Sequence, residues 1–332
     1  MSKRFWIGID VSKKTFHAAV ADRGVSRQAW GDLPCACFDN SRKGMGNLVR
    51  WVREQGVAVE QIAGVCLEAT GRFGRRWAEA MENRLGPVSI VNPAHPVGFA
   101  RSLGIRDKTD RTDACVLALF GKAHQPHPTP PESPRRIELR ELFRFYRALQ
   151  TQCLGNQQRL QDLPDSALVR RELRRSIHAQ EKQLQRLQEA MDRLIDEDPE
   201  LRRQAALART IPGVGPKTVL AILAELGDVR QYKRNEIVAL VGLYPREYTS
   251  GTSVYRKPRL AKGGHPAIRA SLYMGAMTAK RLNPQLGAFA LRLQENGKNP
   301  MQILGALMRK LLLLVRAVIV SGNPYDPAYG NR

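Results

Sequence analysis

Apolar and polar positions follow two different periods in the first hundred residues of the chain. Short, continuous apolar runs predict buried β strands. The expected strands are residues 5–10, 15–21, 26–30, 62–68 and 88–91. Between these runs, apolar residues recur at helical spacing, for example at Leu48 and Val52, or at Trp77, Met81 and Leu85. Strands that alternate with helices predict an α/β domain with a mixed sheet.

The pattern changes in the middle of the chain. Residues 124–136 contain five prolines and predict an extended linker. Residues 137–197 then predict long helices, interrupted near Pro164. In the second helix, apolar residues recur in steps of three and four, as in a short coiled coil, with Gln180 at one apolar position. These apolar residues are Leu173, Ile177, Leu184, Leu187, Met191 and Leu194. A coiled coil would favour self-association, and the alternative is a helical hairpin packed within one chain.

The last third of the sequence predicts mainly helices. The expected helices are residues 219–226, 266–281 and 302–320. Residues 237–243 are expected to form a short helix or an apolar strand, and residues 323–332 are expected to be frayed. Together these patterns predict an α/β + α fold in three parts. The expected domains are residues 1–136, 137–200 and 201–332.

The charge of the chain indicates the kind of partner. Its 332 residues include 53 Lys and Arg against 31 Asp and Glu, a formal net charge of +22. A folded chain this basic attracts polyanions, of which nucleic acid is the leading candidate. No apolar run reaches the ~18 residues of a membrane-spanning helix, and no signal peptide is evident. The five cysteines lack zinc-site spacing, so reduced thiols and a cytoplasmic location are expected.

Four acidic residues form the candidate catalytic group. Asp10 and Glu68 each end an expected strand, and Asp110 and Asp113 are three residues apart, which places them on one face of a helix. Carboxylates are the ligands that Mg²⁺ prefers, and two such ions about 3.5–4 Å apart can assist phosphoryl transfer. The alternative is that the acids only favour helix N-termini through the helix dipole.

Two groups of residues are candidates for contacts with nucleic-acid phosphates. Arg106, Lys108 and Arg111 surround the acidic pair, where they either balance its charge or hold phosphates. The stretch 211–218 resembles the hairpin of a helix–hairpin–helix module. In such a hairpin, Gly213 and Gly215 would let backbone N–H groups approach a phosphate, assisted by Lys217 and the following helix N-terminus. The alternative is a plain turn between helices.

A third candidate stretch is rich in hydroxyl groups. Residues 245–254 read as a polar loop that contains Ser250, and a group of cations follows it. These cations are Arg256, Lys257, Arg259 and Lys262. A lone serine in a loop is usually a turn residue. A hydroxyl among phosphate-binding cations is also where a nucleophile for phosphoryl transfer would lie.

These motifs, taken in order, resemble the DEDD transposases of insertion sequence family 110, to which Piv-type DNA invertases are related. The resemblance extends over nearly the whole chain. It is carried by Gly8-Ile9-Asp10, Leu67-Glu68-Ala69-Thr70-Gly71, Lys108-Thr109-Asp110 with Asp113, Ile211-Pro212-Gly213-Val214-Gly215 and Ser250-Gly251-Thr252-Ser253.

The resemblance implies an N-terminal RNase H-like domain of the RuvC type, a coiled coil and a C-terminal transposase domain. It implies that Asp10, Glu68, Asp110 and Asp113 bind Mg²⁺, and that Ser250 forms a covalent phosphoserine link to DNA. Thr249 and Ser253 are the neighbouring hydroxyls. It further implies guidance by a structured bridge RNA that pairs with donor and target DNA, and a dimer or tetramer whose active site joins two subunits. The location would be the bacterial cytosol or nucleoid.

Two other functions remain as alternatives at this stage. A RuvC-like nuclease would hydrolyse DNA with water and would need no serine. A non-catalytic protein would only bind nucleic acid, through the coiled coil and the helix–hairpin–helix. The ordered set of motifs favours an RNA-guided DNA recombinase over both.

Overall fold

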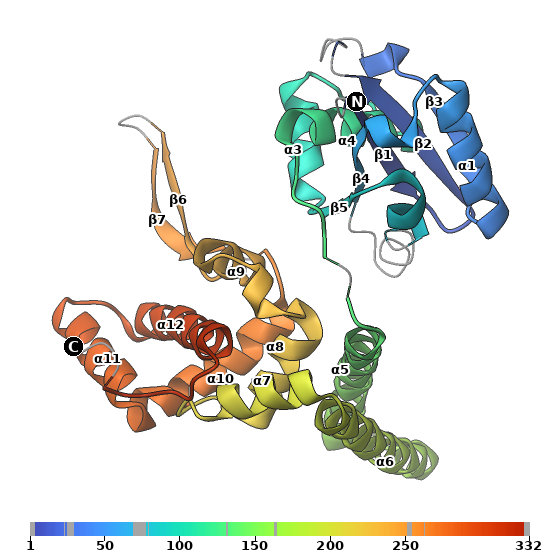
Figure 1. Cartoon of the computed structure of the whole chain (residues 1–332). Helices are drawn as coiled ribbons and strands as arrows, with labels where there is room; N and C mark the ends of the chain where they lie inside the picture. The colour runs from blue at the N-terminus through green and yellow to red at the C-terminus, as the bar shows by residue number, and fades with distance from the viewer. Residues whose placement is uncertain are drawn as a thin grey trace. The chain divides into compact units, whose positions relative to one another are not determined.

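The computed structural model describes residues 4–22, 24, 30–68, 78, 80–130, 132–162, 165–250, 254–261 and 263–328. For residues 247–250 and 254–258 it describes the backbone alone. The chain divides into two compact units, Met1–Pro131 and Glu132–Arg332 (Figure 1).

The first unit is built on a five-stranded mixed sheet in the order β3-β2-β1-β4-β5. Its strands are β1 (Phe5–Val11), β2 (Thr15–Asp22), β3 (Cys35–Asp39), β4 (Ile62–Glu68) and β5 (Val88–Val91). The first three strands are antiparallel neighbours, whereas β4 and β5 run parallel to β1. Parallel pairing requires a crossover, which α1 (Arg42–Glu54) provides between β3 and β4. The mixed α/β sheet is as predicted from the alternating pattern.

The third strand of the sheet does not lie at residues 26–30, where the sequence predicted it. Of residues 26–30, the first four lie outside the described residues and Trp30 begins a 3₁₀ turn. The third strand of the sheet is β3, a short strand of mixed exposure. Its sequence, Cys-Ala-Cys-Phe-Asp, is too short and too mixed in polarity to give a strand signal.

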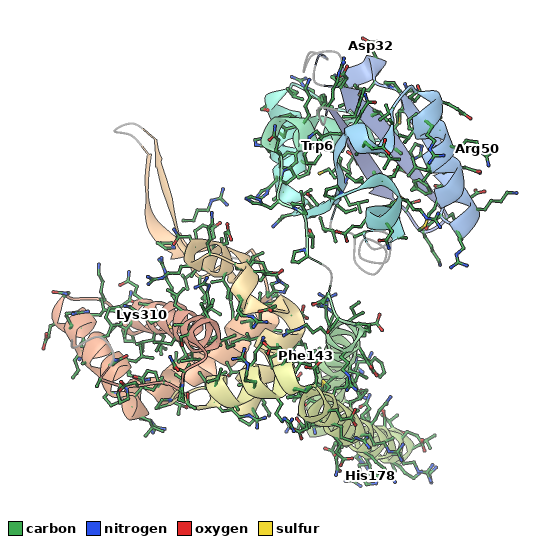
Figure 2. All side chains as sticks on the ribbon, viewed as in Figure 1. Trp6, Asp32, Arg50, Phe143, His178 and Lys310 are labelled. Atoms are coloured by element: carbon green, nitrogen blue, oxygen red, sulfur yellow. The ribbon has the colours of Figure 1, made fainter. Side chains whose placement is uncertain are left out.

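Helices cover both faces of the sheet. On one face, Ile7 and Ile9 of β1 pack with Leu48 and Val52 of α1. The other face is covered by α3 (Ala94–Ser102) and α4 (Asp110–His124). Successive side chains of a strand point to opposite faces, so Trp6 (Figure 2), Gly8 and Asp10 share the α4 face.

Glycine at position 8 lets α4 lie directly on the sheet. A Cβ at Gly8 would overlap the Ala114 carbonyl oxygen and the Ala118 backbone nitrogen of α4. Further along the helix, the Trp6 ring occupies the space that a side chain at Gly121 would need. The two backbones are therefore in contact, and this contact fixes where the first turn of α4 lies.

We predict that Gly8→Ala destabilises the first unit. The added methyl group meets backbone atoms that cannot rotate away, which costs about 1–3 kcal/mol. Gly46→Ala is the matched control, because Gly46 lies in α1 with open space around its Cβ position. That change should be neutral or stabilising by about 0.5–1 kcal/mol. Urea unfolding of the two variants measures the difference, and equal free energies of unfolding would contradict the packing argument.

The proline-rich segment is partly anchored to the sheet. The Thr129 backbone nitrogen donates to the Val88 carbonyl (2.8 Å), and the Ile90 nitrogen donates to the Thr129 hydroxyl (2.8 Å). Ser89 Oγ also donates to the Pro126 carbonyl at 2.8 Å. Residues 126–129 therefore run along the outer edge of β5, and the first part of the expected linker belongs to this unit.

The second unit begins with a pair of long antiparallel helices, α5 (Pro134–Gln161) and α6 (Ala167–Glu197). Gln180 breaks the apolar stripe of α6 because it faces a polar partner: Asn156 Nδ2 donates to Gln180 Oε1 at 3.2 Å. The stripe of α6 is thus covered by α5 of the same chain. This is the hairpin alternative, and self-association through a coiled coil stays a prediction. Pro164 lies outside the described residues.

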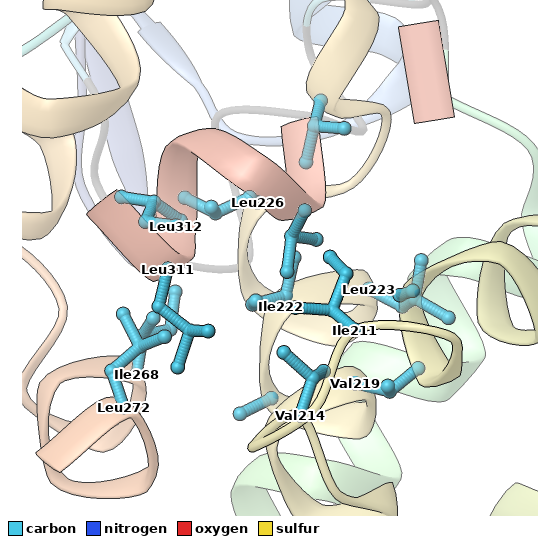
Figure 3. Close-up of a cluster of buried hydrophobic side chains, with 14 of the residues drawn as sticks. Ile211, Val214, Val219, Ile222, Leu223, Leu226, Ile268, Leu272, Leu311 and Leu312 are labelled. Atoms are coloured by element: carbon cyan, nitrogen blue, oxygen red, sulfur yellow. The ribbon is translucent and has the colours of Figure 1, made fainter. Parts of the chain in front are cut away.

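The rest of the second unit is mostly helical, as predicted. Its helices are α7 (Pro199–Arg209), α8 (Pro216–Leu226), α9 (Arg234–Val241), α10 (Pro266–Leu282), α11 (Pro284–Glu295) and α12 (Pro300–Ser321). They share one apolar core, which includes Ile222 and Leu223 of α8, Leu272 of α10 and Leu311 of α12 (Figure 3). None of the helices in the described part of the chain is long and apolar enough to span a bilayer.

The prediction that the C-terminal segment is frayed is wrong for its described part. The Tyr325 hydroxyl donates to Asn283 Oδ1, and the Tyr325 backbone nitrogen donates to the Thr210 hydroxyl, both at 2.9 Å. Gln285 also donates to the Pro327 carbonyl (2.8 Å). A polar, proline-containing tail has no periodic signal, so these contacts with distant residues are invisible in the sequence.

Candidate active site and nucleic-acid interface

Two of the four candidate acids lie side by side at the ends of neighbouring strands. In the β1–β4 pair the last registered partners are Ile9 and Leu67, so Asp10 and Glu68 follow at the same level. Asp10 belongs to the α4 face of the sheet, and His17 of β2 lies directly opposite it. Residues 69–77, which follow Glu68, lie outside the described residues.

The other two acids occupy the first turn of α4. The helix is capped by Thr109, whose hydroxyl accepts from the Thr112 backbone nitrogen at 3.1 Å. Since Thr109 makes the cap, Asp110 and Asp113 are not needed for it. Both lie in the first turn, where the contact at Gly8 brings α4 against β1.

Electrostatic interactions show that the four acids lie close together. Burial, followed by the charges of Asp113, Asp110 and Glu68, raises the pKa of Asp10 to about 6. Burial and Asp113 raise the pKa of Glu68, while Lys108 opposes the change. Burial also raises the pKa of Asp113, again against Lys108. The charged forms of Asp10, Glu68 and Asp113 are thus disfavoured by burial and by neighbouring acids, which a bound cation would relieve.

This donor set suits a hard divalent cation. It offers carboxylate oxygens from two strands and one helix, the ligand type that Mg²⁺ takes. As the side chains stand, no three described His, Cys, Asp or Glu residues are grouped tightly enough to enclose a metal ion. Asp110 has room to move, since 56% of its side chain is exposed.

The cations expected near the acids are all at the surface. Arg106, Lys108 and Arg111 are exposed, on the loop that enters α4 and on its first turn. Lys108 acts electrostatically on Glu68 and Asp113. The structure thus supports charge balance for Lys108, and exposure leaves all three accessible to a phosphate backbone.

Sequence reasoning missed one residue of this site. His17 Nδ1 lies 3.9 Å from Asp110 Oδ2, is buried, and has no hydrogen-bond partner among the described residues. The signal was available in principle. A tight turn at residues 12–14 joins two strands in a hairpin, and its register places His17 opposite Asp10.

Ser250 lies at the far end of a β hairpin in the second unit. The hairpin consists of β6 (Pro245–Ser250) and β7 (Val254–Leu260), with Ser250 opposite Val254, and it projects beyond α9 (Figure 1). The expected loop is thus a strand up to residue 250, since Tyr248 and Thr249 favour β structure. Ser253 lies outside the described residues.

The cations that follow Ser250 are distributed along the second strand of this hairpin. Arg256, Lys257 and Arg259 belong to β7, and Arg259 is exposed. Lys262 lies outside the described residues. A hairpin strand with cations and a terminal serine is an arrangement that can approach a phosphodiester backbone.

The two glycines of the 211–217 hairpin have different environments. Gly213 has a positive φ of 100°, and a Cβ there would lie 2.8 Å from the Gly275 carbonyl oxygen of α10. Its conformation and packing therefore require glycine for structural reasons. Gly215 is exposed, has open space beside it and is the N-cap residue of α8, and the exposed Lys217 lies in the first turn of that helix.

A groove runs beside the turn at residues 211–217. It has a volume of about 910 Å³ and contains the side chains of three cations, Arg147, Arg209 and Lys217. Apolar residues of α5, α8 and α10 form much of the remaining surface. A basic groove at a helix N-terminus is a suitable surface for a nucleic-acid backbone.

Comparisons with known proteins define the class of enzyme. Residues 7–168 match a transposase family model of the DEDD type, and residues 205–290 match the model described as "Transposase IS116/IS110/IS902 family". The chain is 31% identical to the pilin gene-inverting protein of Moraxella bovis over 328 residues, 98% of each chain. The corresponding Moraxella lacunata protein is equally similar, at 31% over 328 residues.

A shorter match links the chain to a mobile element. Over 74 residues, 22% of this chain, it is 35% identical to the transposase for insertion sequence element IS1111A of Coxiella burnetii. Together these matches identify an enzyme of DNA recombination. The chain belongs to the IS110 family of transposases and DNA invertases, so the family predicted from the motifs is confirmed.

Proposed function

We propose that this enzyme recombines DNA by metal-dependent transesterification through a phosphoserine intermediate, guided by a structured RNA. The observation that carries the proposal is the convergence of four carboxylates, Asp10, Glu68, Asp110 and Asp113, at one end of the sheet. Such a group, at the ends of strands in a DNA recombinase, has the chemistry of a metal-dependent phosphoryl-transfer site.

The proposal also assigns a domain type to each part of the chain, in more detail than the observed sheet and helices alone. The first unit is proposed to be an RNase H-like domain of the RuvC type within residues 1–136. Residues 137–200 would be the coiled-coil region, and residues 201–332 the transposase domain with a helix–hairpin–helix. The mixed sheet covered by α4, and the turn between α7 and α8, support these assignments.

The proposed reaction needs no ATP, because each step forms one phosphate ester bond and breaks another. The Ser250 hydroxyl attacks a phosphodiester, which forms a serine–phosphate bond and releases a sugar hydroxyl. Attack by the hydroxyl of another strand then restores the serine. Magnesium, proposed as two ions, would stabilise the charge on the phosphate oxygens and activate the weak serine nucleophile. Asp10, Glu68, Asp110 and Asp113 would hold the ions.

The proposed partners are donor DNA, target DNA and a bridge RNA, bound by a dimer or tetramer. The net charge of +22 supports simultaneous binding of two kinds of nucleic acid. Sequence choice would rest on base pairing to the RNA, because phosphate contacts carry no sequence information. The acids and Ser250 belong to different units of the chain, which is compatible with a site shared between subunits.

A strand-exchange assay tests the proposal. Purified protein is mixed with labelled donor and target DNA, with RNA transcribed from the sequence that flanks the gene, and with Mg²⁺. We expect recombinant product only when RNA and Mg²⁺ are both present. Product formed without RNA would overturn RNA guidance, and product formed in excess EDTA would overturn the metal-dependent mechanism.

The helix–hairpin–helix assignment gives a separate prediction. Lys217→Ala should weaken binding to all DNA sequences equally, because Lys217 would contact a phosphate and no base edge. The slope of log K against log salt concentration should become about one unit less steep. Lys298→Ala, between α11 and α12, is the control. Fluorescence anisotropy over a range of salt concentrations measures both slopes, and identical slopes would contradict this role.

A further inference from the structure

His17 combines three features that connect it with the acidic group. Its β2 position lies directly opposite Asp10 in the register of the sheet. Its Nδ1 atom is buried and has no hydrogen-bond partner among the described residues. That same atom lies 3.9 Å from Asp110 Oδ2, although 23% of the His17 side chain remains exposed.

A buried ring nitrogen without a partner is unfavourable, and it needs a nearby polar group. Asp110 Oδ2 is the carboxylate oxygen that the structure places next to it. The gap exceeds a hydrogen bond of about 2.7–3.2 Å by less than 1.5 Å. Because Asp110 is more than half exposed, a change of its side-chain rotamer can close this gap without moving the backbone.

Residues that bind metal ions usually depend on such second partners. A ligand carboxylate that accepts a hydrogen bond is held in one orientation, and loss of the donor typically costs about 10–100-fold in metal affinity. Asp110 would need this help most, since it lies on the first turn of a helix and is the most loosely held by burial.

We propose that His17 is a positioning residue for the metal site. Its Nδ1–H donates to Asp110 Oδ2 and turns that carboxylate toward Asp10 and Asp113. This inference rests on the proposed role of Asp110 as a metal ligand. It adds a fifth residue to the site, which acts through Asp110 and touches neither metal nor DNA.

The experiment measures metal affinity without any DNA reaction. Mn²⁺ replaces Mg²⁺ as the probe, because it accepts the same oxygen ligands and is paramagnetic. Free Mn²⁺ is titrated by electron paramagnetic resonance in the full-length wild type and in His17→Asn, His17→Gln, His17→Ala and Asp110→Asn. Asparagine carries its amide nitrogen on Cγ, where histidine carries Nδ1, whereas glutamine places its amide one bond further out.

We expect His17→Gln and His17→Ala to weaken Mn²⁺ binding at least about tenfold, and His17→Asn to stay within about threefold of the wild type. If all three His17 variants bind Mn²⁺ like the wild type while Asp110→Asn does not, the positioning role is wrong and the metal site stands. If Asp110→Asn also binds normally, the proposed metal site itself is wrong.

A spectroscopic signature separates positioning from direct ligation. In electron spin echo spectra of the Mn²⁺-loaded wild type, a positioning residue gives no coupling from a directly bound nitrogen. A strong nitrogen coupling that disappears in His17→Gln would overturn the proposal in favour of a histidine ligand. Circular dichroism of each metal-free variant checks the fold. If His17→Ala does not fold, the difference in Mn²⁺ affinity between His17→Asn and His17→Gln decides whether His17 positions Asp110.

Discussion

Ser250→Ala is expected to abolish strand exchange, with a loss of at least about 10³-fold, and to eliminate the covalent protein–DNA adduct. Removing a catalytic nucleophile has effects of this size or larger, because no other group can form the intermediate. The measurement is a denaturing protein gel of reactions with labelled DNA. The wild type should show a labelled protein band, and Ser250→Ala should show none.

The neighbouring hydroxyls provide the controls. Thr249→Val and Ser253→Ala should retain the adduct, since each leaves Ser250 in place at the end of β6. If Thr249→Val or Ser253→Ala removes the adduct instead, the nucleophile has been assigned to the wrong residue. If Ser250→Ala still cuts DNA as fast as the wild type, the enzyme is a nuclease that uses water.

Asp10→Asn is expected to change activity and stability in opposite directions. Strand exchange should fall at least about 10²-fold, because the amide weakens a site whose metal ions supply several kcal/mol of transition-state stabilisation. In EDTA at pH 7.5, the same variant should unfold at a higher temperature than the wild type. The reason is that the charged Asp10 carboxylate is disfavoured by burial and by the other acids.

The sign of the pH dependence follows from the pKa of Asp10. Its ordinary value of 3.8 applies to the unfolded chain, and the value in the folded state is about 6. The folded state therefore holds more protons between these limits, so stability falls as pH rises through this window. The difference corresponds to about 3 kcal/mol, which solvent screening of a partly buried group reduces to about 1–2 kcal/mol.

The stabilising effect of Asp10→Asn should consequently disappear near pH 4, where the wild-type carboxyl is also neutral in the folded state. Calorimetric or dichroism melts at pH 4 and pH 7.5 measure the difference. Asp32→Asn, outside the acidic group, is the control and should show no such change between the two pH values. A loss of thermal stability in Asp10→Asn at pH 7.5 would contradict the repulsion argument.

The sequence predicted the parts of the structure that local patterns determine. The strand that contains Asp10 and the strand that ends at Glu68 follow from apolar runs, and the three-residue spacing of Asp110 and Asp113 indicated that they share one face of a helix. The four acids come close together because α4 crosses β1. That crossing depends on Gly8, and a glycine within an apolar run gives no indication of what it contacts.

The remaining differences involve partners far apart in the chain. Tyr325 is hydrogen-bonded to Asn283, and Thr129 is hydrogen-bonded to the edge of β5. No periodic pattern in the sequence predicts these contacts. His17 was missed for a related reason. The hairpin register already places it opposite Asp10, but its proximity to Asp110 depends on the helix that packs above the strand.

The anchoring of residues 126–129 also restricts how copies of the chain can associate. A bare edge strand offers unpaired backbone groups to which a second chain can add by β pairing. At β5, Thr129 already uses the outward-facing backbone groups of Val88 and Ile90. Contacts between copies at this edge must therefore be made by side chains, whose geometry is specific to the partner, and not by continuation of the sheet.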